Sequence, residues 1–413
     1  IGAEYYDNPP ETNPPGPSPT FSVSGIAYLF SEDDHSGIDV SFYNLVSNED
    51  GPAVFTDTNG SYSIDIAPGL YTITFSKDGY APFDITGFAL DEDTTLDSVT
   101  LFAGSLQEVS GDVSGVWPAG NIYVVTDDII IPSGESLTIE QGVQVRFNLN
   151  TGMICNGTLT ANGSSEFPIY FTSSNPTPSA GEWTNIKLYA EDNVLSHIIY
   201  EWAEDGISGS YANGSTFNYV YMDDTLLQSA NGFVFESSNN MTFTNNYIRV
   251  GGNYGIYVTD GNNSIVNDND IATPTVTGIY FSNAVDSEFN TNILIVDSEN
   301  GYGMDLSNAH NSITSNNTIF INTTGMRMEN CDNCLIDGNS ITGPEYTIGS
   351  CCPNTEWTRV GSYEGILVGS SDNTTVSNNI MEVTQNGINA ASSNNMNIEY
   401  NQISNFWGTA SWD

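Results

Sequence analysis

The chain has 413 residues, of which 51 are acidic and only six are basic, and its formal net charge is -45. Because the six basic residues are scattered, no patch can neutralise a phosphate backbone or an anionic bilayer, so nucleic acids and anionic membranes are not expected as partners. Hydrophobic residues make up 38% of the sequence, which is enough for folded cores and excludes a disordered chain.

The carboxylates that lack basic partners favour an environment that screens them. Either Ca²⁺ binds to them or salt weakens their mutual repulsion, and the sequence leaves both open. No other cofactor is predicted, and no metal ligands can be named. No apolar run reaches the roughly 18 residues that a membrane-spanning helix needs, so we predict no membrane insertion. We therefore expect a secreted protein at the cell surface.

Nine Asn-x-Ser/Thr sequons suit an exported glycoprotein, although so many asparagines also create sequons by chance. The candidate glycosylation sites are Asn59, Asn156, Asn162, Asn213, Asn240, Asn262, Asn316, Asn322 and Asn373.

Residues 1–20 contain six prolines and almost no aliphatic side chains, so they are predicted to form an extended arm. The arm is either a disordered tail or a segment that adds a strand to the sheet edge of a neighbouring subunit. In the second case, Tyr5 and Tyr6 are the predicted contacts.

Residues 21–103 are predicted to form a small β-sandwich. Apolar and polar residues alternate in Phe21–Tyr28, Ser61–Ile66 and Leu70–Phe75, with turn residues between these runs, which is typical of antiparallel strands. The pair Asn59-Gly60 predicts a tight hairpin.

The same segment resembles the carboxypeptidase regulatory-like domains. The resemblance rests on the motif Thr56-Asp57-Thr58-Asn59-Gly60, on Pro68-Gly69-Leu70-Tyr71 and on Gly79-Tyr80. It implies a sandwich of transthyretin-like or immunoglobulin-like topology. Such domains serve as spacers on exported proteins, so the resemblance implies no chemistry for this segment.

Residues 104–413 are predicted to form a right-handed parallel β-helix. Short apolar strands followed by glycine turns open this region, in Gly120–Gly134, Leu137–Phe147 and Gly157–Gly163. They resemble the opening coils of surface-exposed right-handed β-helix proteins of the pectate-lyase-like fold, and the later repeats resemble NosD-type repeats. The resemblance implies an all-β chain with a β-helix solenoid behind the sandwich.

A repeat of about 22 residues supports the β-helix independently. Seven glycines are spaced by 23, 23, 25, 22, 40 and 22 residues, and an asparagine stands 14 residues after each. Residues one and three places after each glycine are apolar, which indicates a strand with one inward face. We expect one pair of strands per coil, bracketed by the glycine and asparagine corners.

We expect the repeated asparagines to turn inward and to hydrogen-bond their copies in neighbouring coils. The repeat glycines are Gly232, Gly255, Gly278, Gly303, Gly325, Gly365 and Gly387. The ladder asparagines are Asn246, Asn269, Asn292, Asn317, Asn339, Asn379 and Asn401.

Four cysteines gather around the one long spacing. Cys331 and Cys334 flank a coil corner, and Cys351 and Cys352 lie in an insertion, residues 342–364. We expect two disulfides that tie the insertion to the coil, with a pairing that the sequence does not reveal. Zinc binding and free thiols are the alternatives. Cys155 is predicted to be a buried apolar side chain.

Two regions are predicted to contact partners. The insertion breaks an otherwise regular wall, and its Trp357 and Tyr363 are the expected contacts for a partner or a glycan. The last coil ends without a polar cap. Phe406, Trp407 and Trp412 therefore either fold over it or are covered by another molecule.

No catalytic set is recognisable, and the protein is predicted not to be an enzyme. The Gly-His-Gly and Arg-x-Lys patterns of polygalacturonases are absent, and a chain this acidic repels uronate polymers. Hydrolysis of a neutral sugar needs only two carboxylates about 5 to 10 Å apart. Asp205, Asp223 and Asp224 are weak nominees for that role. The three histidines have no ligand spacing.

We expect an extracellular structural protein, a subunit of a cell-surface layer, sheath or filament that assembles with copies of itself. The alternatives are a monomeric surface adhesin that binds carbohydrate and a glycosidase that acts on neutral polysaccharide. The arm, the open last coil and the missing catalytic set favour assembly.

Overall fold

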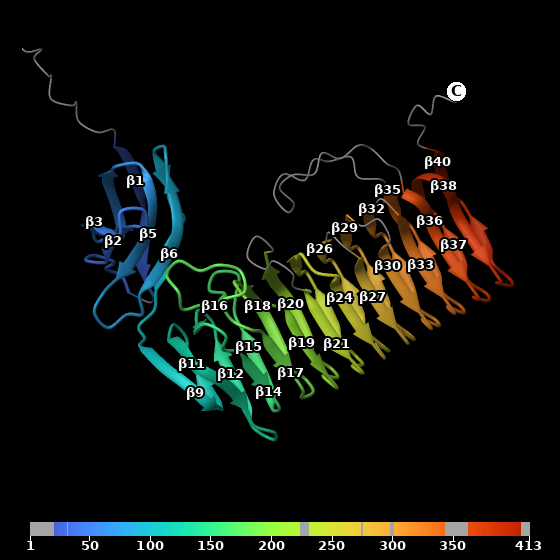
Figure 1. The fold of residues 1–413 in the computed structure, drawn as a ribbon, viewed down its shortest axis with the longest axis horizontal. Coiled ribbons are helices and arrows are strands. Elements are labelled where there is room, and N and C mark those ends of the chain that lie inside the picture. Colours follow the sequence, from blue (N-terminus) through green and yellow to red (C-terminus); the bar gives the residue numbers. More distant parts are fainter. Residues whose placement is uncertain are drawn as a thin grey trace, which may run out of the picture. The chain divides into compact units, whose positions relative to one another are not determined.

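The computed structural model describes residues 20–30, 32–223, 231–273, 276–297, 301–321, 323–342 and 362–405. Every regular element within these ranges is a β-strand, which confirms the all-β class (Figure 1). No helix in them has the length and apolar character needed to cross a membrane. The chain divides into two compact units, residues 1–103 and 104–413.

The first unit is built from two small sheets. Its strands are β1 (Phe21–Leu29), β2 (Asp39–Asn44), β3 (Glu49–Phe55), β4 (Ser61–Ile66), β5 (Gly69–Ser76), β6 (Phe83–Leu90), β7 (Thr94–Thr95) and β8 (Val99–Leu101). One sheet has the order β3-β2-β5-β6 and is antiparallel throughout. In the other, β1 pairs with β4 in antiparallel fashion but with β7 and β8 in parallel. The three runs predicted as antiparallel strands do pair in antiparallel fashion. The parallel pairs arise because after β6 the chain lays β7 and β8 beside β1 in the direction of β1.

The turn at Asn59 and Gly60 is tight but is not a hairpin, since it joins β3 of one sheet to β4 of the other. The Asp57 carboxylate accepts hydrogen bonds from the amides of Asn59 and Ser61, both at 2.9 Å. Gly60 has a φ of 80°, and a Cβ there would lie 2.2 Å from the Ala27 carbonyl oxygen. The turn motif therefore specifies a close crossing between two sheets that share one hydrophobic core.

The second unit is a parallel β-helix with three strands per coil. In the coil of Gly278 these are β27 (Thr277–Ser282), β28 (Glu288–Asn290) and β29 (Ile293–Val296). Each pairs in register with its equivalents in the neighbouring coils, which forms three long parallel sheets. We call them face A, which begins near the repeat glycine, face B and face C, which begins just after the ladder asparagine.

The expectation of two strands per coil is therefore wrong. Face B was missed because most of its strands are only three residues long, too short for visible alternation. Its sequence signal is the residue 11 places after each repeat glycine, which is Phe243 in one coil and Val266 in the next.

The strands of the three faces are as follows. Face A contains β14 (Met153–Cys155), β17 (Ile186–Leu188), β19 (Ile207–Ser210), β21 (Phe233–Glu236), β24 (Tyr254–Thr259), β27, β30 (Tyr302–Ser307), β33 (Thr324–Glu329) and β36 (Ser362–Gly369). Face B contains β10 (Gly115–Trp117), β12 (Ser136–Glu140), β15 (Thr158–Asn162), β22 (Thr242–Thr244), β25 (Ile265–Asn267), β28, β31 (Ile313–Ser315), β34 (Leu335–Asp337), β37 (Thr375–Ser377) and β39 (Asn397–Glu399). Face C contains β13 (Gln144–Phe147), β16 (Ile169–Ser173), β23 (Tyr247–Arg249), β26 (Asp270–Thr273), β29, β32 (Thr318–Ile321), β35 (Ser340–Thr342) and β40 (Gln402–Asn405). Five longer strands serve two faces, namely β9 (Leu106–Asp112), β11 (Ile122–Ile131), β18 (Val194–Tyr200), β20 (Thr216–Met222) and β38 (Ile380–Ala391).

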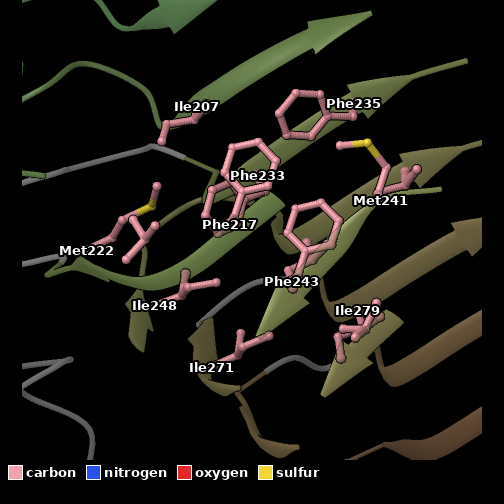
Figure 2. Packing of buried hydrophobic residues seen from close by; sticks show 14 of the residues in the cluster. Ile207, Phe217, Met222, Phe233, Phe235, Met241, Phe243, Ile248, Ile271 and Ile279 are labelled. Atoms are coloured by element: carbon pink, nitrogen blue, oxygen red, sulfur yellow. The ribbon is translucent and has the colours of Figure 1, made fainter. Parts of the chain in front are cut away.

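Inward side chains fill the β-helix in columns along its axis. The apolar residues one and three places after a repeat glycine are buried, as expected, from Phe233 to Val368. Phe217, Phe233, Phe235 and Phe243 pack ring against ring, with centroids 4.8 to 6.2 Å apart (Figure 2). In-register stacking thus turns a repeated apolar residue into a continuous core.

Left-handed residues at the corners explain why the chain is rich in asparagine. In the coil of Gly303, Asn308, Asn311 and Asn316 have φ angles of 49°, 58° and 54°. Asn and Asp tolerate this region better than other non-glycine residues, because their short polar side chains bond to the nearby backbone. Asn308 and Asn311 turn the chain from face A to face B, and Asn316 turns it from face B to face C.

The ladder asparagines are hydrogen-bonded in one continuous column between faces B and C. Asn317 Nδ2 donates to the Asn339 Oδ1 and to the Phe289 carbonyl, both at 2.8 Å. Its Oδ1 accepts from the backbone N and the Nδ2 of Asn292, both at 2.9 Å. The pattern holds from Asn246 to Asn401. Because buried polar groups need partners, this column fixes the register of the coils.

Candidate ligand-binding site

The outward side of face A carries a row of tyrosine, aspartate and arginine. Its four central residues stand two places after successive repeat glycines, in β24, β27, β30 and β33. In-register pairing puts each beside the next, about 4.8 Å apart. With two flanking tyrosines, we call the set the tyrosine–arginine row. It comprises Tyr254, Tyr257, Tyr280, Tyr302, Asp305 and Arg327.

The tyrosine rings stack along the axis of the β-helix. The ring centroids of Tyr257 and Tyr280 are 4.8 Å apart, and the planes differ by 9°. Tyr254 packs against both, with its centroid 4.8 Å from Tyr257 and 5.9 Å from Tyr280. The three residues are half-buried, so each keeps part of its surface accessible.

Arg327 is held in place by a two-pronged ion pair with Asp305. Its Nε donates to Oδ1 at 2.7 Å and its Nη2 to Oδ2 at 2.5 Å. The guanidinium lies 4.3 Å from the ring centroid of Tyr302, and Nη1 donates to the Tyr302 hydroxyl at 3.1 Å. The Asp305 side chain is 4% exposed and that of Arg327 is 35% exposed. The arginine is therefore both accessible and fixed.

Electrostatics keep the row uncharged overall. The hydrogen bonds that Arg327 donates to Asp305 raise the pKa of Arg327, so the guanidinium stays charged and the carboxylate balances it. Burial raises the pKa of Tyr254 and Tyr257, and the neighbouring Tyr280 adds to the rise. The phenols of Tyr254 and Tyr257 therefore remain protonated, and each offers one donor and two acceptor sites. The arrangement can bind a ligand that has many hydroxyl groups.

Face C carries a second cluster of similar composition. The rings of Tyr221 and Tyr247 stack with centroids 4.7 Å apart and planes 4° apart. Arg249 lies 4.0 Å from the Tyr247 centroid and pairs with Asp270 at 2.8 Å. In-register aromatic pairs stabilise sheets wherever they occur, so stacking alone does not define a site. The face C carboxylate is 37% exposed, whereas the face A carboxylate is buried.

A half-buried acid beside the face C cluster was not predicted. Glu201 follows β18 and stands beside Asp223, because Tyr200 pairs with Met222 in register. Thr172 Oγ1 donates to Glu201 Oε2 at 3.2 Å. Burial raises the pKa of Glu201, and the Asp223 carboxylate raises it further. The period of the repeat was identified only from Gly232 onward, so the sequence offered no register for this earlier coil.

The three acids that the sequence nominated for glycan hydrolysis differ in their surroundings. The Asp205 carboxylate accepts hydrogen bonds from the amides of Gly206 and Asn231, at 3.0 and 2.9 Å, so it supports a corner. Asp223 accepts a hydrogen bond from the Tyr221 hydroxyl at 3.0 Å. Asp224 lies outside the described residues.

We expect the variant Glu201→Gln to be more stable than the wild type at pH 7. Because the pKa of Glu201 is higher in the folded than in the unfolded chain, the folded state binds more protons between the two values, and stability falls as pH rises through that window. The difference in stability between the variant and the wild type should vanish below about pH 4, where the Glu201 carboxyl is protonated in both the folded and the unfolded chain. Urea unfolding at both pH values measures it, with the exposed Glu166→Gln as the charge-matched control. An equal gain in the control would contradict the assignment to burial.

The candidate glycosylation sites lie mostly at corners. Asn59, Asn156, Asn162, Asn240, Asn316 and Asn373 are exposed. The half-buried Asn213 and Asn262 are hydrogen-bonded through their side chains, Asn213 to Glu191 at 2.9 Å and Asn262 to Asn239 at 3.1 Å. Asn322 lies outside the described residues. Glycosylation itself stays a prediction.

Cys155, Cys331 and Cys334 are free and buried. The last two were expected in disulfides with Cys351 and Cys352, which lie outside the described residues, so that pairing stays a prediction. In the part of the chain that the structure describes, no group of three or more His, Cys, Asp and Glu side chains could hold a metal ion.

Most of the predicted partner contacts cannot be placed. Tyr5, Tyr6, Trp357, Phe406, Trp407 and Trp412 lie outside the described residues. For Tyr363 only the backbone is described, as part of β36.

Two family descriptions match the second unit in part. The right handed β-helix region matches residues 183–341, and the periplasmic copper-binding protein NosD matches residues 295–410. Neither covers residues 21–103, so the carboxypeptidase regulatory-like resemblance stays a prediction. No curated protein is significantly similar in sequence.

Several solved structures are similar to parts of the chain. A type II cohesin–X-dockerin complex from Acetivibrio cellulolyticus is 22% identical over 20% of this chain, with a TM-score of 0.18, and the match spans only 58% of that structure. A double mutant of the periplasmic alginate epimerase AlgG is 13% identical, with a TM-score of 0.41, over 68% of this chain and 78% of its own. Endopolygalacturonase I from Stereum purpureum is 12% identical, with a TM-score of 0.31, over 69% of this chain and 94% of its own. With the strand pairing and the family matches together, the chain is a right-handed parallel β-helix protein that carries two small N-terminal β-sheets.

Proposed function

We propose that the protein is an extracellular surface protein that binds a neutral glycan on face A. The observation that carries the proposal is the tyrosine–arginine row, where phenol hydroxyls and a fixed guanidinium stand on successive strands. A glycan offers hydroxyl groups at regular intervals, which exchange hydrogen bonds with such groups. The ring edges add apolar contact with the C–H groups of the sugar.

The charge of the chain selects the kind of glycan. A net charge of -45 repels uronate polymers at long range. Asp305 already balances the charge of Arg327, so the row offers no surplus positive charge to a carboxylate polymer. The alginate and galacturonate named for the similar structures are acidic, and we propose a neutral polysaccharide for this chain instead.

Titration calorimetry with soluble β-glucan, mannan and polygalacturonate tests the proposal. Replacing both Tyr257 and Tyr280 by alanine should weaken binding of the neutral polymer at least about tenfold, because losing two hydroxyls and two ring contacts removes more than about 1.4 kcal/mol. The matched control replaces Tyr189 and Tyr211, which are 45% and 67% exposed and lie outside the row. Unchanged binding in the first variant, or a preference for polygalacturonate, would refute the site.

Assembly with copies of the same chain is the second candidate function. The last described coil exposes the columns that are buried elsewhere. Ile398 and Ile403 are 47% and 48% exposed, whereas Ile336 and Ile341 in the same columns are 0% exposed. Apolar side chains that are exposed on strands favour burial against a further copy.

Sedimentation and negative-stain microscopy, with and without Ca²⁺, test the assembly candidate. We expect layers, sheaths or filaments that Ile398→Asp or removal of residues 1–20 abolishes. The exposed substitution Val46→Asp in the first unit serves as the control, since Val46 is 76% exposed. Dispersed particles under all conditions would contradict assembly and leave glycan binding as the one proposed function.

Two further functions are weaker. The pair of Glu201 and Asp223 would allow hydrolysis of a neutral glycan. Reducing ends released from the polysaccharides used for calorimetry would reveal this activity. The copper binding named for NosD does not fit the described residues, where the soft ligands Met304, Met326 and Cys331 point into a fully buried core.

For residues 21–103 we propose the role of a spacer of the carboxypeptidase regulatory-like kind.

A further inference from the structure

Two inward columns of small residues line the corner between faces A and B. The first column, six places after each repeat glycine, contains Ser238, Gly261, Ala284, Ala309, Cys331, Ser371 and Ser393. The second column, nine places after the glycine, contains Met241, Ser264, Ser287, Ser312, Cys334, Thr374 and Met396. Among these seven coils only that of Gly325 has cysteine in these columns, and it has cysteine in both. In this one coil, cysteine therefore takes both positions of the same turn.

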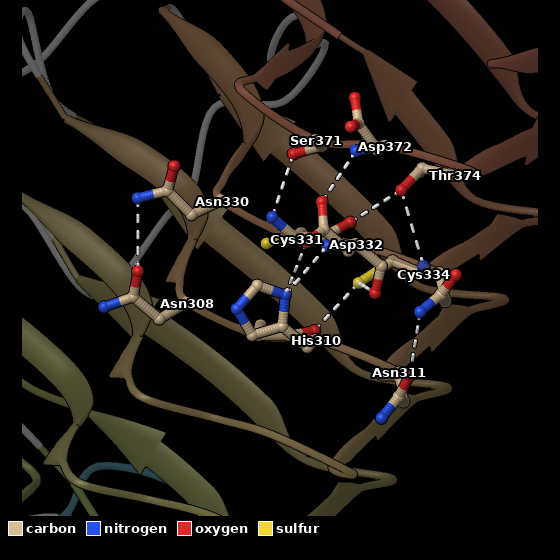
Figure 3. A network of polar contacts seen from close by, with 12 residues as sticks. Asn308, His310, Asn311, Asn330, Cys331, Asp332, Cys334, Ser371, Asp372 and Thr374 are labelled. Carbon is tan, nitrogen blue, oxygen red and sulfur yellow. Dashed lines mark hydrogen bonds and ion pairs between the residues drawn. The ribbon is translucent and has the colours of Figure 1, made fainter. Parts of the chain in front are cut away.

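The turn brings the two cysteines together. In the preceding coil the Ser312 amide donates to the Ala309 carbonyl at 3.3 Å, which closes a turn between the same two columns. Such turns keep the outer Cα atoms within about 7 Å, and disulfides need about 4.4 to 6.8 Å. In the cysteine coil, Thr374 Oγ1 links the two backbones by accepting from the Cys334 amide at 3.4 Å and donating to the Cys331 carbonyl at 2.6 Å (Figure 3).

Both thiols are buried in the core and contact backbone carbonyl groups. Cys331 is 0% and Cys334 is 2% exposed. Cys334 Sγ lies 2.8 Å from the Ala309 carbonyl oxygen, and Cys331 Sγ lies 3.4 Å from that of Glu329. The insertion leaves the coil after β35 of face C, at another corner. A sulfur atom from the insertion would have to enter the packed interior to reach this pair.

We propose that Cys331 and Cys334 form a disulfide with each other inside the turn, before the coil closes over them. The inference uses only the extracellular location from the proposed function, and it does not depend on glycan binding. A small disulfide such as glutathione disulfide is the oxidant. One cysteine thiolate attacks it and releases one glutathione thiol, and the second cysteine then displaces the other. The two cysteines lose two electrons and two protons, and the glutathione disulfide gains them.

Peptide mapping of the full chain, refolded from urea with glutathione disulfide and alkylated without reductant, tests the proposal. Asp332 lies between the two cysteines. Cleavage before this aspartate separates a peptide that ends at Cys331 from one that contains Cys334. We expect these two peptides to remain linked until a reductant is added, while Cys155 is alkylated in the unfolded chain. Separate peptides with alkylated cysteines, or a link to Cys351 or Cys352, would overturn the assignment.

Serine variants give a matched control. The double variant Cys331→Ser, Cys334→Ser should fold, because serine occupies both columns in other coils. It should lose the reductant-dependent shift of the thermal midpoint that the wild type is expected to show once it has been reduced in urea and refolded with dithiothreitol. The folded, oxidised wild type should resist dithiothreitol until urea is added, since the sulfur atoms are buried. A midpoint that reductant shifts equally in both proteins would also overturn the proposal.

Discussion

Replacing Asn317 by alanine is expected to lower the free energy of unfolding by about 3 to 5 kcal/mol, because buried groups that lose their partners cost about 1 to 3 kcal/mol each. The substitution leaves the Asn292 amide without its acceptor, which lies 2.9 Å away, and the Phe289 carbonyl without its donor, which lies 2.8 Å away. Both groups lie in the buried column between faces B and C, where Asn317 is 0% exposed. Urea unfolding and hydrogen exchange of the Asn292 amide measure the effect.

Asn397→Ala is the control for this prediction. Asn397 is exposed and makes one side-chain hydrogen bond, to Glu399 at 3.0 Å. Its loss should change stability by no more than about 0.5 kcal/mol. If both variants lost equally little free energy of unfolding, the asparagine column would not be what holds the coils in register.

Replacing Gly303 by alanine is expected to destabilise the β-helix by about 3 kcal/mol, the upper end of the usual cost of overpacking. An added Cβ would lie 2.3 Å from Ile319 Cγ2 and 2.6 Å from the Gly325 carbonyl oxygen. The backbone oxygen can move away only if face A shifts. The close approach of neighbouring coils thus requires the glycine. Thermal and urea unfolding measure the destabilisation that the alanine variant causes.

Gly278→Ala provides the comparison, because its nearest side-chain atom, Val296 Cγ2, would lie 3.3 Å from the new Cβ. We expect a smaller loss there. Combining Gly303→Ala with Ile319→Ala should cost less than the sum of the single variants, since the second removes the clashing methyl group. Strict additivity would show that the clash with Ile319 is not the cause.

The β-helix could be predicted because its coil is a local pattern repeated many times. Gly303 and Asn317 each recur at fixed places, and each place has one physical requirement, close backbone approach for glycine and buried hydrogen bonds for asparagine. Face B escaped prediction because a strand such as Thr242–Thr244 has one inward side chain and no visible alternation. The left-handed corners were also missed, because Asn308 and Asn311 look like any other polar loop residues in a sequence.

In the first unit the sequence predicted strands and the turn at Gly60, but not their partners. Strand alternation identifies an inward face and says nothing of which edge meets which. The Asn59-Gly60 motif therefore suggested a hairpin, where the structure has a crossing between sheets.

The sequence by itself determined the all-β class, the coil period and the inward columns, because burial imposes a repeated apolar or asparagine residue on each coil. Only the tertiary structure decided which outward side chains meet. Tyr280 and Asp305 are 25 residues apart, and Asp305 and Arg327 are 22 residues apart, so they become neighbours only when the coils stack in register. No core packing constrains these outward positions, so their residues change from coil to coil and leave no period to detect. The candidate glycan site and the Glu201 carboxyl beside Asp223 were visible for that reason only in three dimensions.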